Sequence, residues 1–170
     1  VEPLEQIGPL IKQRNPNTLL HVDGVQSFCK LPLNLNAWQA DLFSCSAHKI
    51  HGPKGIGALW VRSGTLLTPL LEGGGQERNL RPGTENTAGI AGFGLAATLS
   101  EQRREQAAVS MHCLKLKLYR GLLDENLKVE LNGPPLKDSA PHILNLSFPE
   151  VKGEVLLHAL EEHGVLVSVG

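Results

Sequence analysis

Apolar positions recur with two different periods along this chain, and the change of period predicts its elements. The first fifteen residues predict a helix, because Leu4, Ile7, Leu10 and Ile11 recur at helical spacing. Short apolar runs then predict strands around residues 18–23, 40–46 and 55–61. A strand–helix–strand order of this kind is typical of an α/β fold, and we expect part of a mostly parallel sheet.

The pattern changes after residue 73. Residues 73–84 are rich in glycine and predict no regular element, whereas residues 87–126 predict one long helix with a leucine-rich stripe. The remainder predicts strands over 129–131, 142–148 and 165–169 and a helix over 153–163, which together form a small α+β unit. We therefore expect a large-domain part over 1–86, a connecting helix over 87–126 and a small-domain part over 127–170.

Composition excludes several classes of protein. The 170 residues carry a formal net charge of −1, which argues against a nucleic-acid partner held through its phosphates. There is no apolar run long enough to cross a membrane. Cys29, Cys45 and Cys113 show neither metal-site spacing nor an even disulfide framework. We expect no metal, and a reducing cytoplasm is the default location.

Two strand ends carry candidate chemistry. Lys49 follows an apolar strand and enters a turn rich in glycine and proline, and Asp23 comes at the end of the preceding strand. A positioned lysine amine attacks carbonyl groups and forms Schiff bases. Open α/β sheets bind ligands at the carboxyl ends of their strands. The exposed amides, two arginines and hydroxyl of residues 73–84 suit an anion.

A lysine for an aldehyde, a carboxylate for a pyridinium nitrogen and an anion site together favour pyridoxal phosphate. Two plainer interpretations stay open on these residues alone. Lys49 would then be a solvated loop lysine, and residues 73–84 would be a flexible connector.

Three motifs carry a family resemblance. They read Asp-x-x-Gln from Asp23, Ser-x-His-Lys-x-x-Gly-Pro-Lys-Gly from Ser46, and Gly-Gly-Gly-Gln-Glu-Arg-x-x-Arg-x-Gly-Thr-x-Asn from Gly73. In this order they resemble the cysteine desulfurases, which are fold-type I pyridoxal-phosphate enzymes of the class V aminotransferase group. The resemblance runs over the whole chain and implies an aspartate-aminotransferase-like large domain followed by a small α+β domain.

The resemblance implies a role for each matching residue. Lys49 would join the cofactor aldehyde and carry the α-proton, Asp23 would pair with the pyridinium nitrogen, and Gln26 would donate to the phenolate oxygen. Ser46 and His48 match residues that hold the cofactor phosphate. Thr84 matches a threonine that reaches the phosphate of the partner subunit, which implies a homodimer.

The activity implied is conversion of L-cysteine to L-alanine, with the sulfur passed on as an enzyme persulfide for iron–sulfur cluster or thio-cofactor biosynthesis. The partner would be a sulfur-acceptor protein such as an iron–sulfur scaffold. In the family the nucleophilic cysteine lies just beyond the position of Gly170, and none of the three cysteines here matches it. We therefore expect this chain alone to be inactive.

Two alternatives to this activity remain. Selenocysteine lyases share these motifs, and other class V enzymes share the lysine and the aspartate. A remnant without catalysis, which dimerises or binds a partner, is the other alternative.

Overall fold

The computed structural model describes residues 2–169, which divide into two compact parts. The first part is Glu2–Glu105, and the second begins at Gln106. The boundary lies inside the long helix α3 (Thr87–Asp124), where the sequence predicts one long helix. The three-part division at residues 86 and 126 stays a prediction.

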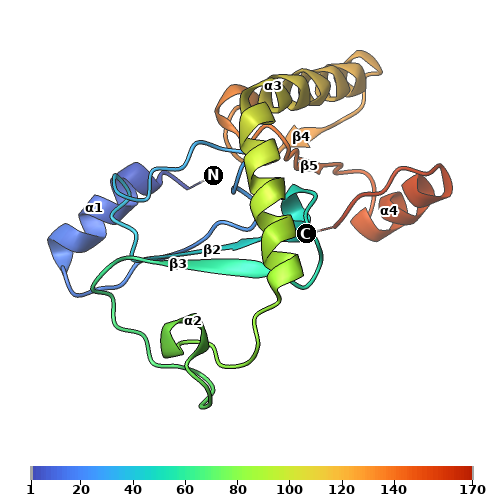
Figure 1. Cartoon of the computed structure of the whole chain (residues 1–170). Coiled ribbons are helices and arrows are strands. Elements are labelled where there is room, and N and C mark those ends of the chain that lie inside the picture. Colours follow the sequence, from blue (N-terminus) through green and yellow to red (C-terminus); the bar gives the residue numbers. More distant parts are fainter. Residues whose placement is uncertain (1, 170) are drawn as a thin grey trace. The chain divides into compact units, whose positions relative to one another are not determined.

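The first part contains a three-stranded sheet with helices around it (Figure 1). Its elements are α1 (Leu4–Arg14), β1 (His21–Asp23), β2 (Leu42–Ser46), the 3-10 helix η1 (Ala47–Ile50), β3 (Gly57–Val61), the short α2 (Gln76–Asn79) and the first half of α3. The strand order is β1-β2-β3. The α/β class predicted from the sequence is confirmed.

The sheet is mixed within this chain. β1 pairs with β2 in parallel, and β3 pairs with β2 in the antiparallel sense. A parallel return needs a crossover of about a dozen residues or more. The connection between β2 and β3 holds only η1 and one turn, so the chain can only fold back on itself there.

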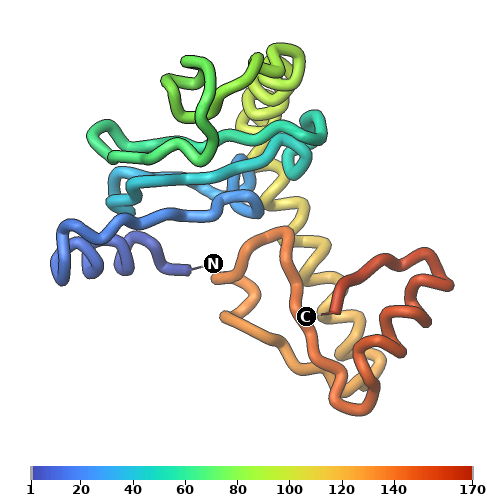
Figure 2. Tube along the Cα trace, turned by 90° about the horizontal axis from the view of Figure 1, so that it is seen from below, coloured from blue at the N-terminus to red at the C-terminus, as the bar shows by residue number. Residues whose placement is uncertain are grey.

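Two apolar clusters hold the first part together. Val22 and Phe43 point to one face of the sheet and pack with Trp38 and Ala40. A second cluster joins Ala47 and Ile50 of η1 to Phe93 and Ala96 of α3. The Phe28 ring lies between these clusters, because its centroid is 6.2 Å from that of Phe43 and 6.0 Å from that of Phe93. Figure 2 shows the strands running side by side next to α1 (dark blue).

A polar tie anchors α1 to the sheet. Lys12 Nζ lies 2.5 Å from Asp41 Oδ2, and the backbone N–H of Leu20 donates to the same oxygen at 2.7 Å. Asp41 is buried. Burial alone would raise the pKa of Asp41, but the hydrogen bonds from Lys12 and Leu20 outweigh it and the pKa is lowered.

The second part contains the second half of α3, a hairpin and one further helix. β4 (Glu130–Leu131) pairs with β5 (Leu146–Ser147) in the antiparallel sense, η2 (Leu136–Asp138) lies between them, and α4 (Gly153–Glu162) follows. Among the described residues of this part, only Lys115 and Ala140 are buried. Lys115 Nζ donates to Ser139 Oγ at 2.5 Å and to the Ala140 carbonyl at 2.7 Å.

Two local predictions are wrong. Residues 165–169 form no strand, because neither strand of the two-stranded sheet in this part pairs with them. Residues 73–84 do contain a regular element, the four-residue α2. Its residues Glu77 and Arg78, and Asn79 after them, have φ between 46° and 63°, so this turn is left-handed rather than an ordinary helix.

Within residues 2–169, the helices are all too short or too polar to cross a membrane. The same residues contain no group of His, Cys, Asp and Glu side chains that could hold a metal ion.

Candidate active site

The candidate site begins at the carboxyl ends of the two parallel strands. Asp23 is the last residue of β1 and pairs in register with Ser44 of β2. The Gly24 N–H donates to the Ser44 carbonyl at 2.8 Å, which holds the two strand ends together. Asp23 and Ser46 are therefore the last residues of two adjacent strands and lie at the same end of the sheet.

The backbone around Asp23 keeps its carboxylate fixed and exposed. One oxygen, Oδ1, accepts a hydrogen bond from the Val25 N–H at 3.0 Å. A Cβ at Gly24 would lie 1.9 Å from the Phe43 ring, so only glycine fits where the chain turns over the core. Gln26 lies in the same turn and is exposed.

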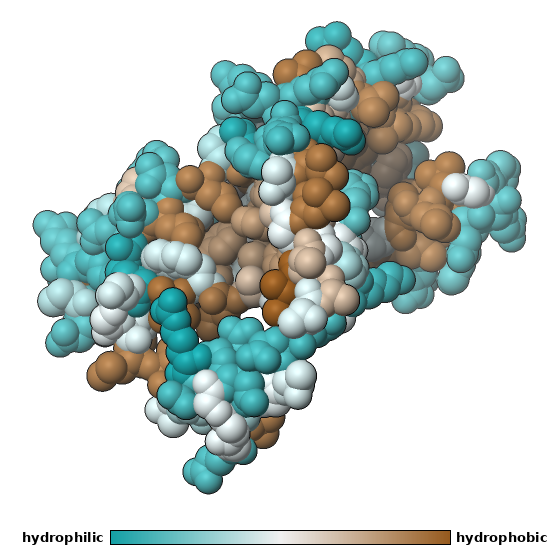
Figure 3. All heavy atoms as spheres, viewed as in Figure 1, coloured by the Kyte–Doolittle hydropathy of each residue, from teal (hydrophilic) through white to brown (hydrophobic). Residues whose placement is uncertain are grey.

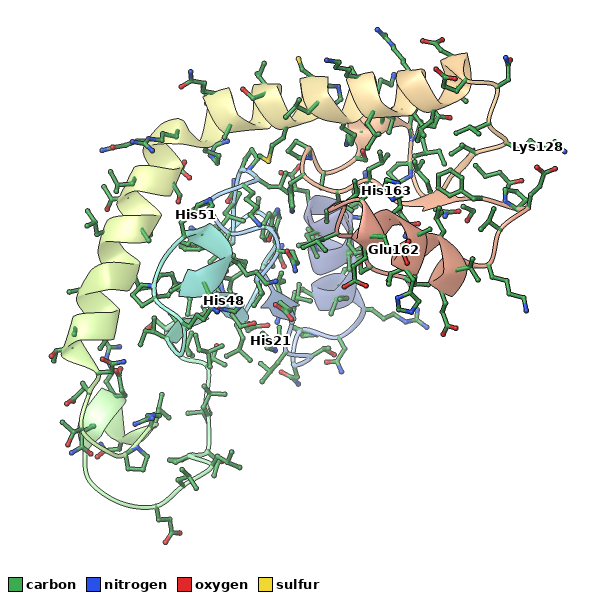
Figure 4. All side chains as sticks on the ribbon, turned by 90° about the vertical axis from the view of Figure 1, so that its right-hand side faces the viewer. His21, His48, His51, Lys128, Glu162 and His163 are labelled. Atoms are coloured by element: carbon green, nitrogen blue, oxygen red, sulfur yellow. The ribbon has the colours of Figure 1, made fainter. Side chains whose placement is uncertain are left out.

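The geometry of the 3-10 helix η1 explains why the Lys49 side chain faces away from the core. Ala47 and Ile50 are three residues apart, which places them on one side of a 3-10 helix, and both are buried in the core. His48 and Lys49 consequently face the other side, with His48 exposed and Lys49 half-buried. Figure 4 shows His48 within η1, His51 at its end, and His21 on the neighbouring strand β1.

The turn after η1 is closely packed. His51 ends η1 with a left-handed φ of 65°, and the Gly52 N–H donates to the Ala47 carbonyl at 2.9 Å. A Cβ at Gly52 would lie 2.9 Å from the Ala47 side chain and 3.1 Å from that of Ala96. Because neither neighbour can move far, Gly52 is needed to keep η1 against α3.

Ser46 and His48 form a pair suited to an anion. Ser46 Oγ and His48 Nδ1 are 2.7 Å apart. If the hydroxyl donates, the neutral imidazole keeps an N–H at Nε2; if Nδ1 donates, the hydroxyl keeps its own proton. Either tautomer leaves one donor of this pair for a bound phosphate oxygen.

The structure does not bring all six predicted residues together. Five of them lie at or just after the carboxyl ends of β1 and β2, namely Asp23, Gln26, Ser46, His48 and Lys49. Thr84 lies in the exposed segment before α3, and the described residues show no hydrogen bond between it and the other five. Lys49 and Asp23 likewise make no direct hydrogen bond or ion pair with each other among the described residues.

One neighbour of Lys49 was missed from the sequence. Lys30 is half-buried in the turn that follows β1. Burial lowers the pKa of Lys30, and the nearby positive charge of Lys49 lowers it further. Cys29 and Ile50, the residues next to these two lysines, belong to one core cluster. Nothing in the sequence pattern singled out Lys30, because it lies in a turn without a recognisable motif.

The cysteines beside the site are poor nucleophiles. Burial, followed by the charge of Glu101, raises the pKa of Cys29 to about 11. Burial also raises the pKa of Cys45, whose thiol lies 3.8 Å from the Ala58 carbonyl. Both thiols are therefore protonated at neutral pH, which suits packing rather than attack.

A sequence model described as aminotransferase class-V matches residues 1–170. The chain belongs to this family. Class-V aminotransferases and the cysteine desulfurases among them depend on pyridoxal phosphate, which confirms the cofactor predicted from the sequence. The donor set at the strand ends fits that group, since it combines an amine, a carboxylate and a hydroxyl–imidazole pair.

Individual relatives agree with this placement. The chain is 42% identical over 170 residues to a cysteine desulfurase of Nostoc sp., matching all of this chain and 42% of that protein. A solved NifS-like protein superposes with a TM-score of 0.92 at 40% identity, covering 100% of this chain and 46% of the other. A structure described as SspA in complex with cysteine superposes with a TM-score of 0.71 at 31% identity, covering 100% and 45%. The family resemblance drawn from the three motifs is confirmed, and the chain spans less than half the length of these relatives.

Proposed function

We propose that this chain forms part of a pyridoxal-phosphate-dependent cysteine desulfurase, which converts L-cysteine to L-alanine and passes the sulfur on as an enzyme persulfide. The observation that carries the proposal is the placement of Asp23 at the end of β1 and of Lys49 just after the end of the adjacent parallel strand β2, in a chain that matches the class-V family throughout. A cysteine complex among the similar structures supports the substrate.

The cofactor, when bound, supplies an aldehyde for an amino group and an electron-withdrawing ring that acidifies the α-carbon of the substrate. Lys49 would hold the cofactor through its side-chain amine and would move the substrate's α-proton. Asp23, whose Oδ1 accepts from the Val25 N–H, would keep a proton on the ring nitrogen of the cofactor. Gln26 would donate to the phenolate oxygen of the cofactor, and Ser46 and His48 would hold its phosphate.

We infer that the working protein is a homodimer. Thr84 is exposed and makes no hydrogen bond to the other site residues within the described chain, which supports a role at the phosphate site of a partner subunit. The persulfide would pass to an acceptor protein such as an iron–sulfur scaffold. Three free thiols are consistent with a reducing compartment, and we infer the cytoplasm.

Reductive trapping tests the cofactor site directly. The chain is incubated with pyridoxal phosphate, reduced with borohydride and analysed by intact mass and peptide mapping. We expect one cofactor adduct on Lys49 and complete loss of that adduct in Lys49→Ala. Lys54→Ala is the matched control, because Lys54 is an exposed lysine in the same loop. An adduct that persists in Lys49→Ala, or that maps to Lys54, would contradict the assignment.

A further inference from the structure

The turn after β1 fixes the backbone at Lys30 against the helix α3. The Lys30 N–H donates to the Ser27 carbonyl at 3.0 Å, which closes the turn. Beside Lys30, the buried Cys29 thiol donates to the Ala97 carbonyl of α3, with 3.7 Å between the two atoms. The backbone at Lys30 is therefore held both by its own turn and by α3, and its side chain is half-buried.

The same face of α3 also holds the backbone next to Lys49. The Ser100 hydroxyl donates to the Ile50 carbonyl at 3.3 Å. Ser100 follows Ala97 by three residues, and residues at this spacing are neighbours on one face of a helix. The two contacts thus bring the chain beside Lys30 and the chain beside Lys49 to adjacent positions on α3. Figure 3 shows hydrophobic atoms (brown) along the first half of this helix.

The charge of Lys30 is not neutralised by a carboxylate. Within residues 2–169, Lys30 forms no ion pair. The charged groups of α3 that act on the neighbouring Cys29 are Glu101 and Arg104, and these two pair with each other at 2.9 Å. Burial lowers the pKa of Lys30, and the positive charge of Lys49 lowers it further. In the part of the chain that the structure describes, Lys49 is therefore the charged group that acts on Lys30.

Electrostatic repulsion between two ammonium groups acts on both of them equally, so the charge of Lys30 acts on Lys49 in turn. The titratable groups nearest to Lys49 in the site do not pair with it. His48 contacts the Ser46 hydroxyl at 2.7 Å, and Asp23 makes no hydrogen bond or ion pair with Lys49 in the described chain. A neighbouring cationic group is one of the means by which a lysine becomes a nucleophile at neutral pH.

We propose that Lys30 is a positioning residue for Lys49, and that its ammonium charge favours the neutral amine form of Lys49, which is the form that attacks an aldehyde. Lys30 performs this role without touching the cofactor. The inference rests on the proposed function, because a cofactor with an aldehyde group is what the Lys49 amine would react with.

Trace labelling with acetic anhydride measures the neutral fraction of each lysine without any cofactor. The natural chain and Lys30→Met are labelled between about pH 7 and pH 11, and peptide mass spectrometry gives the extent of labelling at each lysine. In Lys30→Met, the pH of half-maximal labelling at Lys49 should rise by about half a pH unit. In Lys49→Met, the corresponding pH at Lys30 should rise by the same amount, which a purely structural role of Lys30 would not produce.

Two further variants separate the charge of Lys30 from its packing. Lys30→Arg keeps the charge, so its Lys49 should be labelled as in the natural chain. Lys54→Met removes an exposed lysine from the loop that follows Lys49, and it should also leave the labelling of Lys49 unchanged. Circular dichroism and tryptophan fluorescence check that each variant folds.

The reaction with the cofactor gives a second readout. At neutral pH, the adduct of pyridoxal phosphate on Lys49, trapped with borohydride, should form about threefold more slowly in Lys30→Met than in the natural chain or Lys30→Arg, because half a pH unit changes the neutral amine by that factor. A shift in labelling without any adduct would support the effect of Lys30 on Lys49 and contradict the proposed function.

Two results would overturn the inference. One is an unchanged pH of half-maximal labelling at Lys49 in Lys30→Met. The other is a shift in Lys30→Arg as large as that in Lys30→Met, which would assign the effect to packing instead of charge. In both cases an adduct on Lys49 would leave the proposed function intact.

Discussion

The two parts of the chain are stabilised in different ways. The part up to Glu105 buries aromatic and aliphatic side chains in two clusters, and the candidate site lies directly on them. In the described residues after Glu105, a lysine and an alanine are the buried residues. Burial of apolar surface is the main source of folding free energy. The first part therefore holds its site on a core of its own, whereas the described residues of the second bury little apolar surface.

A half-buried lysine, Lys12, and a buried one, Lys115, show the same contrast on a smaller scale. Lys12 is neutralised by Asp41, whose carboxylate it contacts directly. Lys115 donates only to a hydroxyl and a carbonyl, and burial lowers its pKa. A buried charge with a partner is costly to break, while one without a carboxylate is often replaceable by an apolar side chain.

The strongest way to break the contrast is to remove Phe43, which is 2% exposed and joins both core clusters through the Phe28 ring. Phe43→Ala should lower the free energy of unfolding of the first part by about 4 kcal/mol, because it leaves a cavity. Urea unfolding followed by tryptophan fluorescence reports on this part alone, since Trp38 and Trp60 both lie in it. Leu118→Ala, which changes an exposed leucine of the second part, is the control. Its unfolding is followed by circular dichroism because that part holds no tryptophan, and an equal loss there would refute the contrast.

Breaking the ion pair between Lys12 and Asp41 should lower the free energy of unfolding somewhat less than Phe43→Ala does. Asp41→Asn leaves Lys12 without its carboxylate and should lower the free energy of unfolding by about 3 kcal/mol. Because the pKa of Asp41 is lowered on folding, its contribution is present above the unfolded pKa and is lost as the pH falls through the folded pKa. Unfolding curves between neutral and acidic pH should show this acid-linked loss in the natural chain and a smaller one in Asp41→Asn. If the free energy of unfolding depended on pH equally in the two proteins, the ion pair between Lys12 and Asp41 would not be the source of the acid-linked loss.

The difference in burial between the two parts should also appear in the reactivity of their cysteines. Cys113 is exposed in the second part, whereas Cys29 is buried in the first with a pKa raised to about 11. Alkylation at neutral pH should modify Cys29 at least about tenfold more slowly than Cys113, because both burial and protonation protect it. Timed quenching and peptide mass spectrometry measure both rates in one sample. Comparable rates would mean that the first core opens readily.

The smallest change in the free energy of unfolding is expected on replacing Lys115. Its pKa is lowered on folding, so between that pKa and the unfolded value of about 10.5 the unfolded chain binds more protons, and stability rises with pH. Lys115→Met should remove this rise and change the free energy of unfolding at neutral pH by less than about 1.5 kcal/mol. Circular dichroism between pH 7 and pH 10 measures the slope. If Lys115→Met lowered the free energy of unfolding as much as Asp41→Asn does, the hydrogen bonds of Lys115 to Ser139 and Ala140 would outweigh the cost of burying its charge.

Much of the first part could be predicted because its signals are local. Apolar runs bounded by turn residues located β2 and β3, and helical spacing located α1. The strand end at Asp23 followed from the same pattern. The motif around Lys49 could be recognised because glycine, proline and histidine occur there in a fixed order.

The rest depended on contacts between distant residues. The antiparallel sense of β3 follows from the length of its connection, and no apolar pattern encodes it. Residues 165–169 have a strand-like composition but lack a neighbouring strand, and pairing rather than propensity decides that state. Lys30 approaches Lys49 only because β1 and β2 pair, so its place near the site could not be found from its own neighbours in the sequence.

The compact first part also sets an order of events during synthesis. β1, β2 and η1 lie between His21 and Ile50, and the cluster beneath them is complete once Phe93 and Ala96 have been added. At roughly 5–20 residues per second, a ribosome needs several further seconds to make the residues after Glu105. The strand ends that carry Asp23 and Lys49 can thus collapse onto their own core while the later residues are still being translated, so a slow or faulty second part need not distort them.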